Sequence, residues 1–468
     1  MESLNRHRNF IFGRPDISQT DTKMAASDSI TWDFDQASQM GAKNSSSSNI
    51  ISNVREILKD PKRLQAIQHV ALRGGPQIKH LQKTFFTNNL TPHETETLKT
   101  WISEVQIPAG KPTATPQGQD ESHSSSVTAA VIAVLSHIPD LKTLEVQTFD
   151  RTAEDEEAQL HPAGDTFTAQ LLQHLTSSSS PPGNFGRVLE TARISVPRPD
   201  DDPEDDMDYY VYPTSLVPLF SLPNIQRIKA HRVDDGGEPV TGVTTSQTLR
   251  ELRLVLCQLT EESLGLVLAA APNLTALHCQ LILDAEHVSG WFDLGKVRAS
   301  LDGLRGSLEA FSFVLTLWTS TAIDCGNEGP WGIRGSLGSL RDFDRLTRLS
   351  VSLPVLLGWH IQGSAKLADV LPAGIRSLTI TNEMSYWWRY EWNGVDWDNA
   401  RGRYDIPRWK WIEEKIVEYL ESRPGSLEEL GLDLSNDGET ERGAQLRGTL
   451  VSKGQEVGVK VAVRFKSS

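Results

Sequence analysis

The sequence is poor in positive charge and in long apolar runs. Lysine and arginine together number 46 against 61 acidic residues, which gives a formal net charge of −15. A protein that neutralises many phosphates needs a broad positive field, so this balance argues against nucleic acid and against an anionic membrane surface as general partners. No stretch reaches the roughly 18 consecutive apolar residues of a membrane-spanning helix. We therefore expect neither nucleic-acid binding nor membrane insertion.

Cysteine is also scarce. The chain contains only Cys257, Cys279 and Cys325, and they form no C-x-x-C pair and no Cys/His spacing typical of a metal site. Three cysteines cannot all pair with one another, so buried thiols in a reducing compartment are the simpler interpretation. The first residues lack the apolar core of a secretory signal. We expect a cytoplasmic or nuclear protein that binds no metal and no cofactor.

Sequence motifs of catalysis are missing as well. There is no glycine-rich phosphate loop, no H-E-x-x-H motif and no G-x-S-x-G turn around a nucleophile. His278 precedes Cys279, but neighbouring residues of a strand point to opposite faces, which predicts a core thiol instead of a nucleophile beside its base. The sequence therefore favours a protein that is not an enzyme. A hydrolase that uses acidic residues in loops is a third alternative, after the two binding roles given below.

Composition divides the chain into a leader, a structured region and loop insertions. Residues 1–49 are polar and end in a serine tract, which predicts a disordered leader. A structured region is expected over 50–468, interrupted by insertions at about 108–126, 177–208 and 384–411. The second insertion includes the acidic run at 200–208, which is typical of a solvated loop.

The sequence does contain a repeated hexad, apolar-x-x-apolar-x-apolar. The last two apolar residues of each copy are two apart, so on a strand they face the same side, while the first closes the core from the preceding turn. One such strand cannot bury its apolar side, but copies stacked at about 4.8 Å form a parallel sheet with a continuous core. Eight copies begin at Leu141, Ile225, Leu249, Leu274, Leu308, Leu346, Ile375 and Leu427, and two less regular copies begin at Ile67 and Leu189.

The segment that follows Leu249 also predicts a return path, which is the helix that leads the chain from the end of one strand back to the start of the next. Cys257 falls where a small buried residue is needed, Thr260 is a good N-cap, and Pro272 ends the helix that the apolar spacing predicts between them. An apolar helix followed by proline and a strand recurs before two other hexads, so we expect helices and strands to alternate along the chain.

The stretch from Leu249 to Thr260 reads L-x-x-L-x-L-x-x-C-x-L-T and resembles the cysteine-type leucine-rich repeat. With its unequal return paths, the region from about 55 to 465 resembles the repeat regions of fungal F-box/leucine-rich-repeat proteins. This resemblance implies an irregular α/β solenoid, with a curved parallel sheet inside and helices outside.

The same resemblance implies protein–protein recognition, as in substrate receptors of cullin ubiquitin ligases that bind the ligase adaptor. Residues 1–60 lack the Leu-Pro-x-Glu-like start of an F-box. A free-standing leucine-rich-repeat scaffold unrelated to ubiquitin is therefore the alternative.

The exposed face of the predicted sheet consists of residues that flank the core positions of each strand. Basic residues gather in its middle, and the candidate binding set is Arg227, Lys229, His231, Glu251, Arg253, His278 and Arg348. Charge-assisted hydrogen bonds from this set would suit an acidic peptide of a protein partner. A solvated face with internal Glu–Arg pairs is the alternative interpretation.

Tryptophan is concentrated in the last insertion, where six of the 12 tryptophans lie between 387 and 411. Because tryptophan is enriched at binding hot spots, Trp387, Trp388, Trp392 and Trp397 are candidates for an aromatic lid over a binding site. The alternative is a brace, in which the large aromatic side chains anchor the insertion on the rest of the fold.

Overall fold

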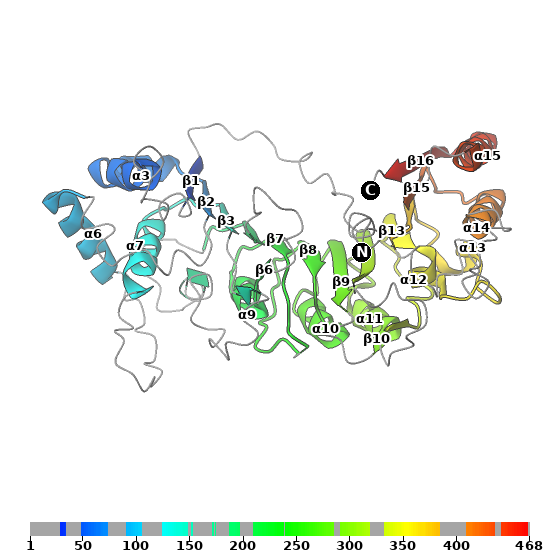
Figure 1. Cartoon of the computed structure of the whole chain (residues 1–468), viewed down its shortest axis with the longest axis horizontal. Coiled ribbons are helices and arrows are strands. Elements are labelled where there is room, and N and C mark those ends of the chain that lie inside the picture. Colours follow the sequence, from blue (N-terminus) through cyan, green and yellow to red (C-terminus); the bar gives the residue numbers. More distant parts are fainter. Residues whose placement is uncertain are drawn as a thin grey trace, which may run out of the picture. The chain divides into compact units, whose positions relative to one another are not determined.

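The computed structural model describes residues 29–33, 48–73, 90–104, 124–147, 151–152, 171–172, 174, 187–196, 209–237, 239–284, 291–318, 332–383, 409–435 and 441–466. Helices are interspersed among the strands along these residues, in agreement with the α/β class that the sequence predicts (Figure 1). Within them, no helix combines the length and the apolar character needed to cross a membrane.

Twelve strands form one long parallel sheet, in which neighbouring strands follow each other in chain order. Their bounds are β1 (Ser29–Asp33), β2 (His69–Arg73), β3 (Thr143–Gln147), β5 (Thr191–Ser195), β7 (Arg227–His231), β8 (Glu251–Cys257), β9 (Ala276–Asp284), β11 (Ala310–Trp318), β13 (Arg348–Ser352), β14 (Ser377–Thr381), β15 (Glu429–Ser435) and β16 (Lys460–Lys466). Two small ribbons stand apart from it: β4 (Arg151–Thr152) pairs with β6 (Tyr209–Tyr210), and β10 (Trp291–Asp293) pairs with β12 (Gly332–Arg334).

The chain divides into two compact units. Among the described residues, the N-terminal unit comprises those from 29 to 234 and from 240 to 252, and the C-terminal unit comprises 235–237, 239 and those from 253 to 466. Strand β8 begins in the first unit and ends in the second.

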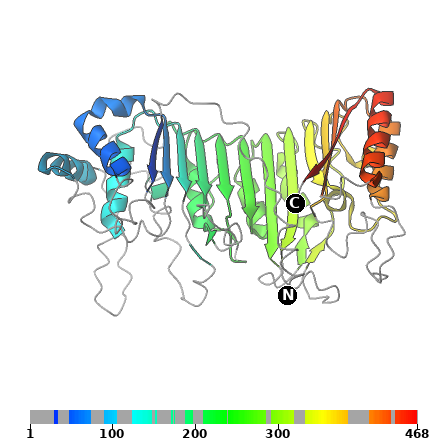
Figure 2. The same ribbon diagram turned by 45° about the horizontal axis from the view of Figure 1, so that its top comes forward.

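The N-terminal unit contains strands β1, β2, β3, β5 and β7, which lie side by side in parallel (Figure 2). Its helices include α3 (Ser48–Lys59), α6 (Pro92–Glu104), α7 (Ser124–Ser136) and the short α9 (Pro213–Leu216), with 3-10 turns η2 (Pro61–Ala66) and η6 (Val217–Ser221). Helix α7 is apolar and buried, because Val131, Val134, Leu135 and the following Ile138 all face the core, as their spacing predicts.

Helix α6 begins with a reciprocal cap that also holds a buried charge. The Thr91 amide donates to Glu94 Oε2 at 2.7 Å, and the Glu94 amide donates to Thr91 Oγ1 at 3.3 Å. Arg55 Nε of helix α3 lies 3.4 Å from the same carboxylate, whose side chain is only 4% exposed. Burial alone would raise the pKa of Glu94, but the Thr91 hydrogen bonds and the charges of Arg55 and Lys59 lower it.

The C-terminal unit contains strands β9, β11, β13, β14, β15 and β16 in parallel register. Its helices are α10 (Glu261–Ala269), α11 (Leu294–Leu301), α12 (Leu353–Leu357), α13 (Leu367–Val370), α14 (Lys410–Glu421) and α15 (Glu441–Val457), with the 3-10 turn η7 (Asp302–Leu304). Figures 1 and 2 show α10 packed beside α11, and α14 packed beside α15.

The predicted cap of helix α10 is confirmed and is part of a larger hydrogen-bond set. The Thr260 hydroxyl accepts from the Ser263 amide at 3.1 Å. The Thr260 amide and hydroxyl both donate to Asp235 Oδ2, at 2.7 and 2.8 Å. The Asp235 carboxylate also accepts from the Gly237 amide, so the turn at 235–237 is fastened to the start of the helix.

Every predicted hexad forms a strand, and eight of these ten strands begin with the same backbone contact, at β3, β5, β7, β8, β11, β13, β14 and β15. In the N-terminal unit the Gln68 carbonyl accepts from the amides of Lys142 and Thr143, and the next strands repeat this arrangement. In the C-terminal unit the Thr275 carbonyl accepts from Glu309 and Ala310, with equivalent bonds at the start of β13, β14 and β15. The contact falls at the same hexad position each time, so the repeat is structural as well as sequential.

The core follows the hexad positions. In β3 the side chains of Leu144 and Val146 are buried, whereas the flanking Thr143, Glu145 and Gln147 are half-buried. The alternating faces of a strand produce this pattern, and β5 shows the same one. The prediction that each strand has one buried and one more exposed face is confirmed for these strands.

Three predictions of organisation need correction. Strand β1 lies inside the expected disordered leader of 1–49, because Trp32 is buried beside β2 and its neighbours complete the ladder. Strand β5 lies inside the expected insertion at 177–208, where Ala192 and Ile194 fill the core. Helices α7 and α14 begin before the expected ends of the first and last insertions. The rest of the leader up to residue 47, and the greater part of each insertion, lie outside the described residues.

Candidate functional site

The half-exposed residues of the parallel strands form the surface on which the sequence places its candidate site. Strand register sets which of these side chains are neighbours, because residues paired across two strands lie about 4.8 Å apart. Four members of the predicted set, Arg227, Lys229, His231 and Glu251, belong to the N-terminal unit. The other three, Arg253, His278 and Arg348, belong to the C-terminal unit.

In the N-terminal unit, strands β5 and β7 carry three cationic side chains close together. The register pairs Arg193 with Lys229 and Thr191 with Arg227. Arg227 is exposed, and its Nε donates to Thr191 Oγ1 at 3.2 Å, which turns this guanidinium along the sheet surface. We call Arg193, Arg227 and Lys229 the basic face.

On the β3 side, the basic face has an acidic neighbour. Glu145 is paired in register with Arg193, and Arg193 Nη1 lies 4.0 Å from Glu145 Oε2. The two side chains are 33% and 23% exposed, so water still reaches both of them. This long ion pair orients Arg193 without enclosing it, and at such exposure it contributes little to stability.

Arg193 is absent from the set predicted from sequence. Its strand falls within the insertion expected at 177–208, and the copy beginning at Leu189 is one of the two less regular ones. The alternation Thr191–Ala192–Arg193–Ile194–Ser195 is the signal that identifies the strand, since its second and fourth residues are apolar.

In the C-terminal unit, the corresponding positions are mostly uncharged. One row of register partners consists of His278, Ser312, Ser350, Thr379, Gly431 and Ala462. Arg348 lies one row away, and its register partners are Ala310 and Ser377. Within this unit the predicted basic residues are therefore not gathered into one cluster.

Charges return at the last two strands of the C-terminal unit, where they are paired. Lys460 Nζ lies 2.9 Å from Glu429 Oε1, and Arg464 Nε donates to Asp433 Oδ1 at 2.7 Å. The two pairs lie on either side of Gly431 and Ala462 in the strand register.

The two thiols within the described residues lie in the core. Cys257 and Cys279 are buried and unbridged, and burial together with the neighbouring Cys257 raises the pKa of the Cys279 thiol. A buried thiol with a raised pKa is a poor nucleophile. His278 lies on the other, half-exposed face of β9, as predicted. Cys325 lies outside the described residues, and the described part of the chain contains no group of three or more potential metal ligands.

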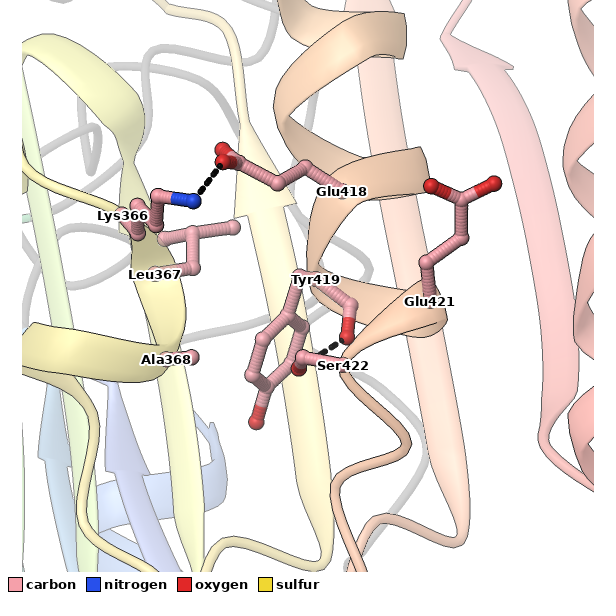
Figure 3. A pocket seen from close by; sticks show the side chains of 7 residues that line it. All are labelled: Lys366, Leu367, Ala368, Glu418, Tyr419, Glu421 and Ser422. Carbon is pink, nitrogen blue, oxygen red and sulfur yellow. Dashed lines mark hydrogen bonds and ion pairs between the residues drawn. The ribbon is translucent and has the colours of Figure 1, made fainter.

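A cavity of about 280 Å³ lies between helices α13 and α14 (Figure 3). Lys366, Leu367, Ala368, Glu418, Tyr419, Glu421 and Ser422 line it. Its charges are paired, since Lys366 Nζ lies 3.0 Å from Glu418 Oε1 and Lys453 Nζ lies 3.0 Å from Glu421 Oε1. Burial raises the pKa of Tyr419 to about 12, so its hydroxyl stays protonated at neutral pH. The lining offers no nucleophile with an adjacent base.

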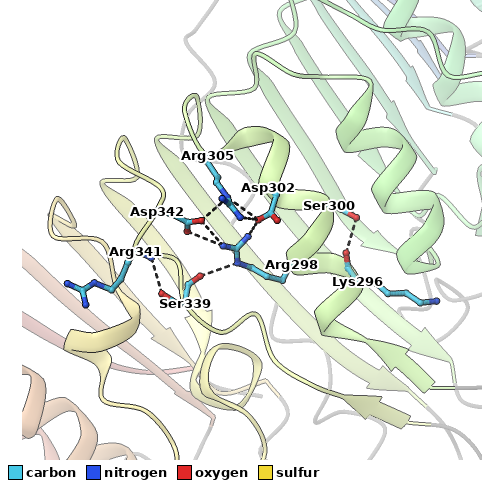
Figure 4. Close-up of polar contacts among 8 residues, drawn as sticks. All are labelled: Lys296, Arg298, Ser300, Asp302, Arg305, Ser339, Arg341 and Asp342. Carbon is cyan, nitrogen blue, oxygen red and sulfur yellow. Dashed lines mark hydrogen bonds and ion pairs between the residues drawn. The ribbon is translucent and has the colours of Figure 1, made fainter.

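A dense ion-pair cluster joins helix α11 to the turn at 339–342 (Figure 4). Arg298 Nε donates to the Ser339 carbonyl at 3.1 Å, and its Nη2 lies 3.0 Å from Asp342 Oδ1. Asp302 pairs with both Arg298 and Arg305, and the Arg298 guanidinium also stacks 5.0 Å from the Phe343 ring centroid. The Arg298 side chain is only 17% exposed, so this cluster fastens neighbouring segments together instead of presenting a charge.

Of the six tryptophans between 387 and 411, Trp409 and Trp411 lie within the described residues. Trp409 is 1% exposed, and its ring centroid lies 5.8 Å from that of Phe465 on β16. Trp409 is therefore a core residue, as a brace requires. Trp387, Trp388, Trp392 and Trp397 lie outside the described residues.

Comparison with known proteins adds no assignment. No protein-family model matches the chain, and no curated protein matches it either.

Proposed function

We propose that the chain is a leucine-rich-repeat protein whose strands and return segments stack as an irregular, curved solenoid. Three observations support this proposal: the hexad recurs at every strand of the long sheet from β2 to β15, the same carbonyl contact begins most of these strands, and helix α10 follows β8 with the expected threonine cap. A repeat that buries its apolar side only against its neighbours has these properties.

The proposed function is recognition of another protein, without catalysis. The basic face of the N-terminal unit would bind an acidic segment of the partner. The register of Arg193 opposite Lys229, with Arg227 nearby on β7, is the observation that carries the proposal. An acidic ligand would accept charge-assisted hydrogen bonds from these neighbouring donors. In a chain of net charge −15, such a concentration of cations is a local exception.

The resemblance to F-box/leucine-rich-repeat receptors adds a prediction about the kind of partner. Material that copurifies with the tagged full-length chain from its own cells would include the cullin-ligase adaptor if the protein is a substrate receptor. Mass spectrometry of that material separates a receptor from a free-standing scaffold, because a scaffold would bring down partners without the adaptor.

Binding to the basic face can be measured with a defined probe. We expect a fluorescein-labelled peptide Gly-Glu-Glu-Gly-Glu-Glu-Gly to bind the full chain in fluorescence anisotropy, and its glutamine counterpart to bind much more weakly. The double variant Arg193→Glu, Arg227→Glu should weaken binding by roughly tenfold or more, because two attractive charges become repulsive. Added salt should weaken wild-type binding.

A matched control makes the same change of charge elsewhere in the unit. Arg63 and Lys99 are exposed, with side chains 56% and 64% accessible, and lie in η2 and helix α6. Arg63→Glu with Lys99→Glu should leave peptide binding nearly unchanged. Equal weakening by both double variants would show that net charge, and not the basic face, attracts the peptide, and the proposal would then fail.

A further inference from the structure

Gly431 in β15 leaves one position on the half-exposed face of the C-terminal unit without a side chain, and we call this position the notch. A Cβ atom at this position would lie 3.0 Å from Thr379 Oγ1 and 3.4 Å from Arg464 Nη2. Thr379 precedes the notch on β14, and Arg464 reaches it from β16, so donors from both neighbouring strands converge over one residue. Gly431 has no positive φ, so the backbone conformation does not require glycine here, whereas the nearby Thr379 and Arg464 side chains leave little room for a Cβ atom.

Both donors at the notch have unused capacity. Arg464 Nε donates to Asp433 Oδ1, but within the described part of the chain its Nη atoms meet no acceptor. Over the same residues, the Thr379 hydroxyl has no hydrogen-bond partner. The Arg464 side chain is 61% exposed, whereas that of Asp433 is 12% exposed. Asp433 therefore holds the guanidinium by its Nε edge and leaves the Nη edge directed over Gly431.

We propose that Arg464 and Thr379 form a subsite across Gly431 that binds a side-chain carboxylate of a partner polypeptide, with Asp433 as a positioning residue. A carboxylate oxygen can accept from a guanidinium and a hydroxyl at once, and bonds of this kind are about twice as strong as those between neutral groups. The Gly431 notch allows that oxygen to approach the sheet surface, where a side chain would exclude it. The subsite lies wholly in the C-terminal unit and does not depend on the basic face.

The test uses two capped tripeptides, Ac-Gly-Glu-Gly-NH2 and Ac-Gly-Gln-Gly-NH2, which differ in charge but hardly in shape. Each is titrated into the full chain labelled with ¹⁵N-arginine, and the Nε–H signal of Arg464 is followed by NMR after assignment with Arg464→Lys. We expect the glutamate peptide to shift this signal in a saturable manner, with an affinity about tenfold above that of the glutamine peptide. Loss of one hydroxyl donor in Thr379→Val should lower the affinity about fivefold.

Three further variants separate the subsite from a structural role. Gly431→Ala should reduce binding at least as much as Thr379→Val, because the new methyl fills the notch. Ser350→Ala, in the same row one strand away, should leave the affinity unchanged. Asp433→Asn should weaken binding if Asp433 positions Arg464, whereas a carboxylate that merely repels the ligand would give stronger binding on its removal.

The proposal is overturned if the Arg464 signal does not respond, if both peptides bind equally, or if Thr379→Val and Gly431→Ala bind like the wild type. Melting temperatures of Thr379→Val, Ser350→Ala and Asp433→Asn should stay close to that of the wild type, since these three side chains are partly exposed. Failure here leaves the basic face untested, because no residue is shared between the two surfaces.

Discussion

On the exposed face of the N-terminal unit, strands β5 and β7 place Arg193 opposite Lys229, whereas β11 and β13 of the C-terminal unit place Ser312 opposite Ser350. The backbone around both positions is the same: parallel strands, one residue in register with one, and a bifurcated carbonyl contact at the start. The buried positions are also equivalent, with apolar side chains in both units. The difference is therefore confined to residues that do not build the core.

This comparison indicates where the sequence is free to vary. A core position must be apolar in every strand, because each strand buries its neighbours, whereas a half-exposed position contributes little to stability and accepts serine or arginine. Function in such a scaffold depends on the exposed side chains. Substitutions at core positions should consequently change stability, whereas substitutions at half-exposed positions should change binding.

The largest effect is expected at the core positions. Leu144 in β3 and Leu349 in β13 occupy the same hexad position and are 1% and 2% exposed. Replacing either leucine by alanine should lower the free energy of unfolding by about 3 kcal/mol, through lost burial and a residual cavity. Urea denaturation followed by circular dichroism measures the loss.

Half-exposed neighbours provide the control for this prediction. Thr143→Ala and Ser350→Ala should each change the free energy of unfolding by less than about 0.5 kcal/mol. A loss below about 1 kcal/mol for only one of the two leucine variants would show that the units do not share equivalent cores.

A smaller effect is expected at the ion-pair cluster, which is specific to the C-terminal unit. Arg298→Ala removes the hydrogen bonds to Ser339 and Asp342 and leaves two acidic groups without their best partner. We expect a loss of about 2 kcal/mol, between the values for surface and buried ion pairs. Arg345→Ala is the matched control: it removes the exposed pair with Glu309 and should cost about 0.5 kcal/mol or less.

The contribution of Arg298 should also depend on pH. Burial would raise the pKa of Asp302, but hydrogen bonds from Arg305 and Arg298 lower it below its usual range. A lowered pKa in the folded state stabilises the protein above the ordinary aspartate pKa, and this stabilisation disappears as the pH falls through the lowered value. The difference between wild type and Arg298→Ala should therefore shrink in strongly acidic solution. A difference that stays constant down to that range would contradict the ionic role of the cluster.

The sequence predicts the strands better than their contacts. The hexad locates ten strands of the sheet because two apolar residues two apart are required wherever a strand covers the core. Strands β1 and β16 escape it, because β1 presents only Trp32 and Ile30, and the Val461, Val463 and Phe465 alternation of β16 lacks the preceding hexad leucine. Both strands lie at the ends of the strand order, where a strand pairs with a neighbouring strand on one side only.

The candidate site was predictable only in part, for a similar reason. Arg227 and Lys229 follow from the regular copy at Ile225, but Arg193 does not, since its strand carries Ala192 in the core. Arg464 and Thr379 are far apart in the sequence. Their donors come together only over Gly431, on the strand between them. Spacing within one strand contains no information on that convergence.

The smallest expected effect tests whether charge alone distinguishes the two exposed faces. Ser312→Arg with Ser350→Lys would reproduce the Arg193–Lys229 arrangement on β11 and β13, with the same register and the same parallel direction. In a chain that already carries Arg193→Glu and Arg227→Glu, we expect these substitutions to restore binding of the Glu-rich peptide about threefold, since exposed ion pairs contribute less than about 1 kcal/mol. Fluorescence anisotropy measures the change.

Its control is Ser312→Gln with Ser350→Gln, which adds comparable length without charge and should restore nothing. If the charged pair also restores nothing while melting temperatures are unchanged, two cations in register are insufficient. The Arg227–Thr191 hydrogen bond and the Glu145–Arg193 pair, which orient the guanidinium groups along the surface, would then be required parts of the basic face. Recovery by the charged pair alone would mean that strand register supplies the geometry and that the side chains need supply only their charge.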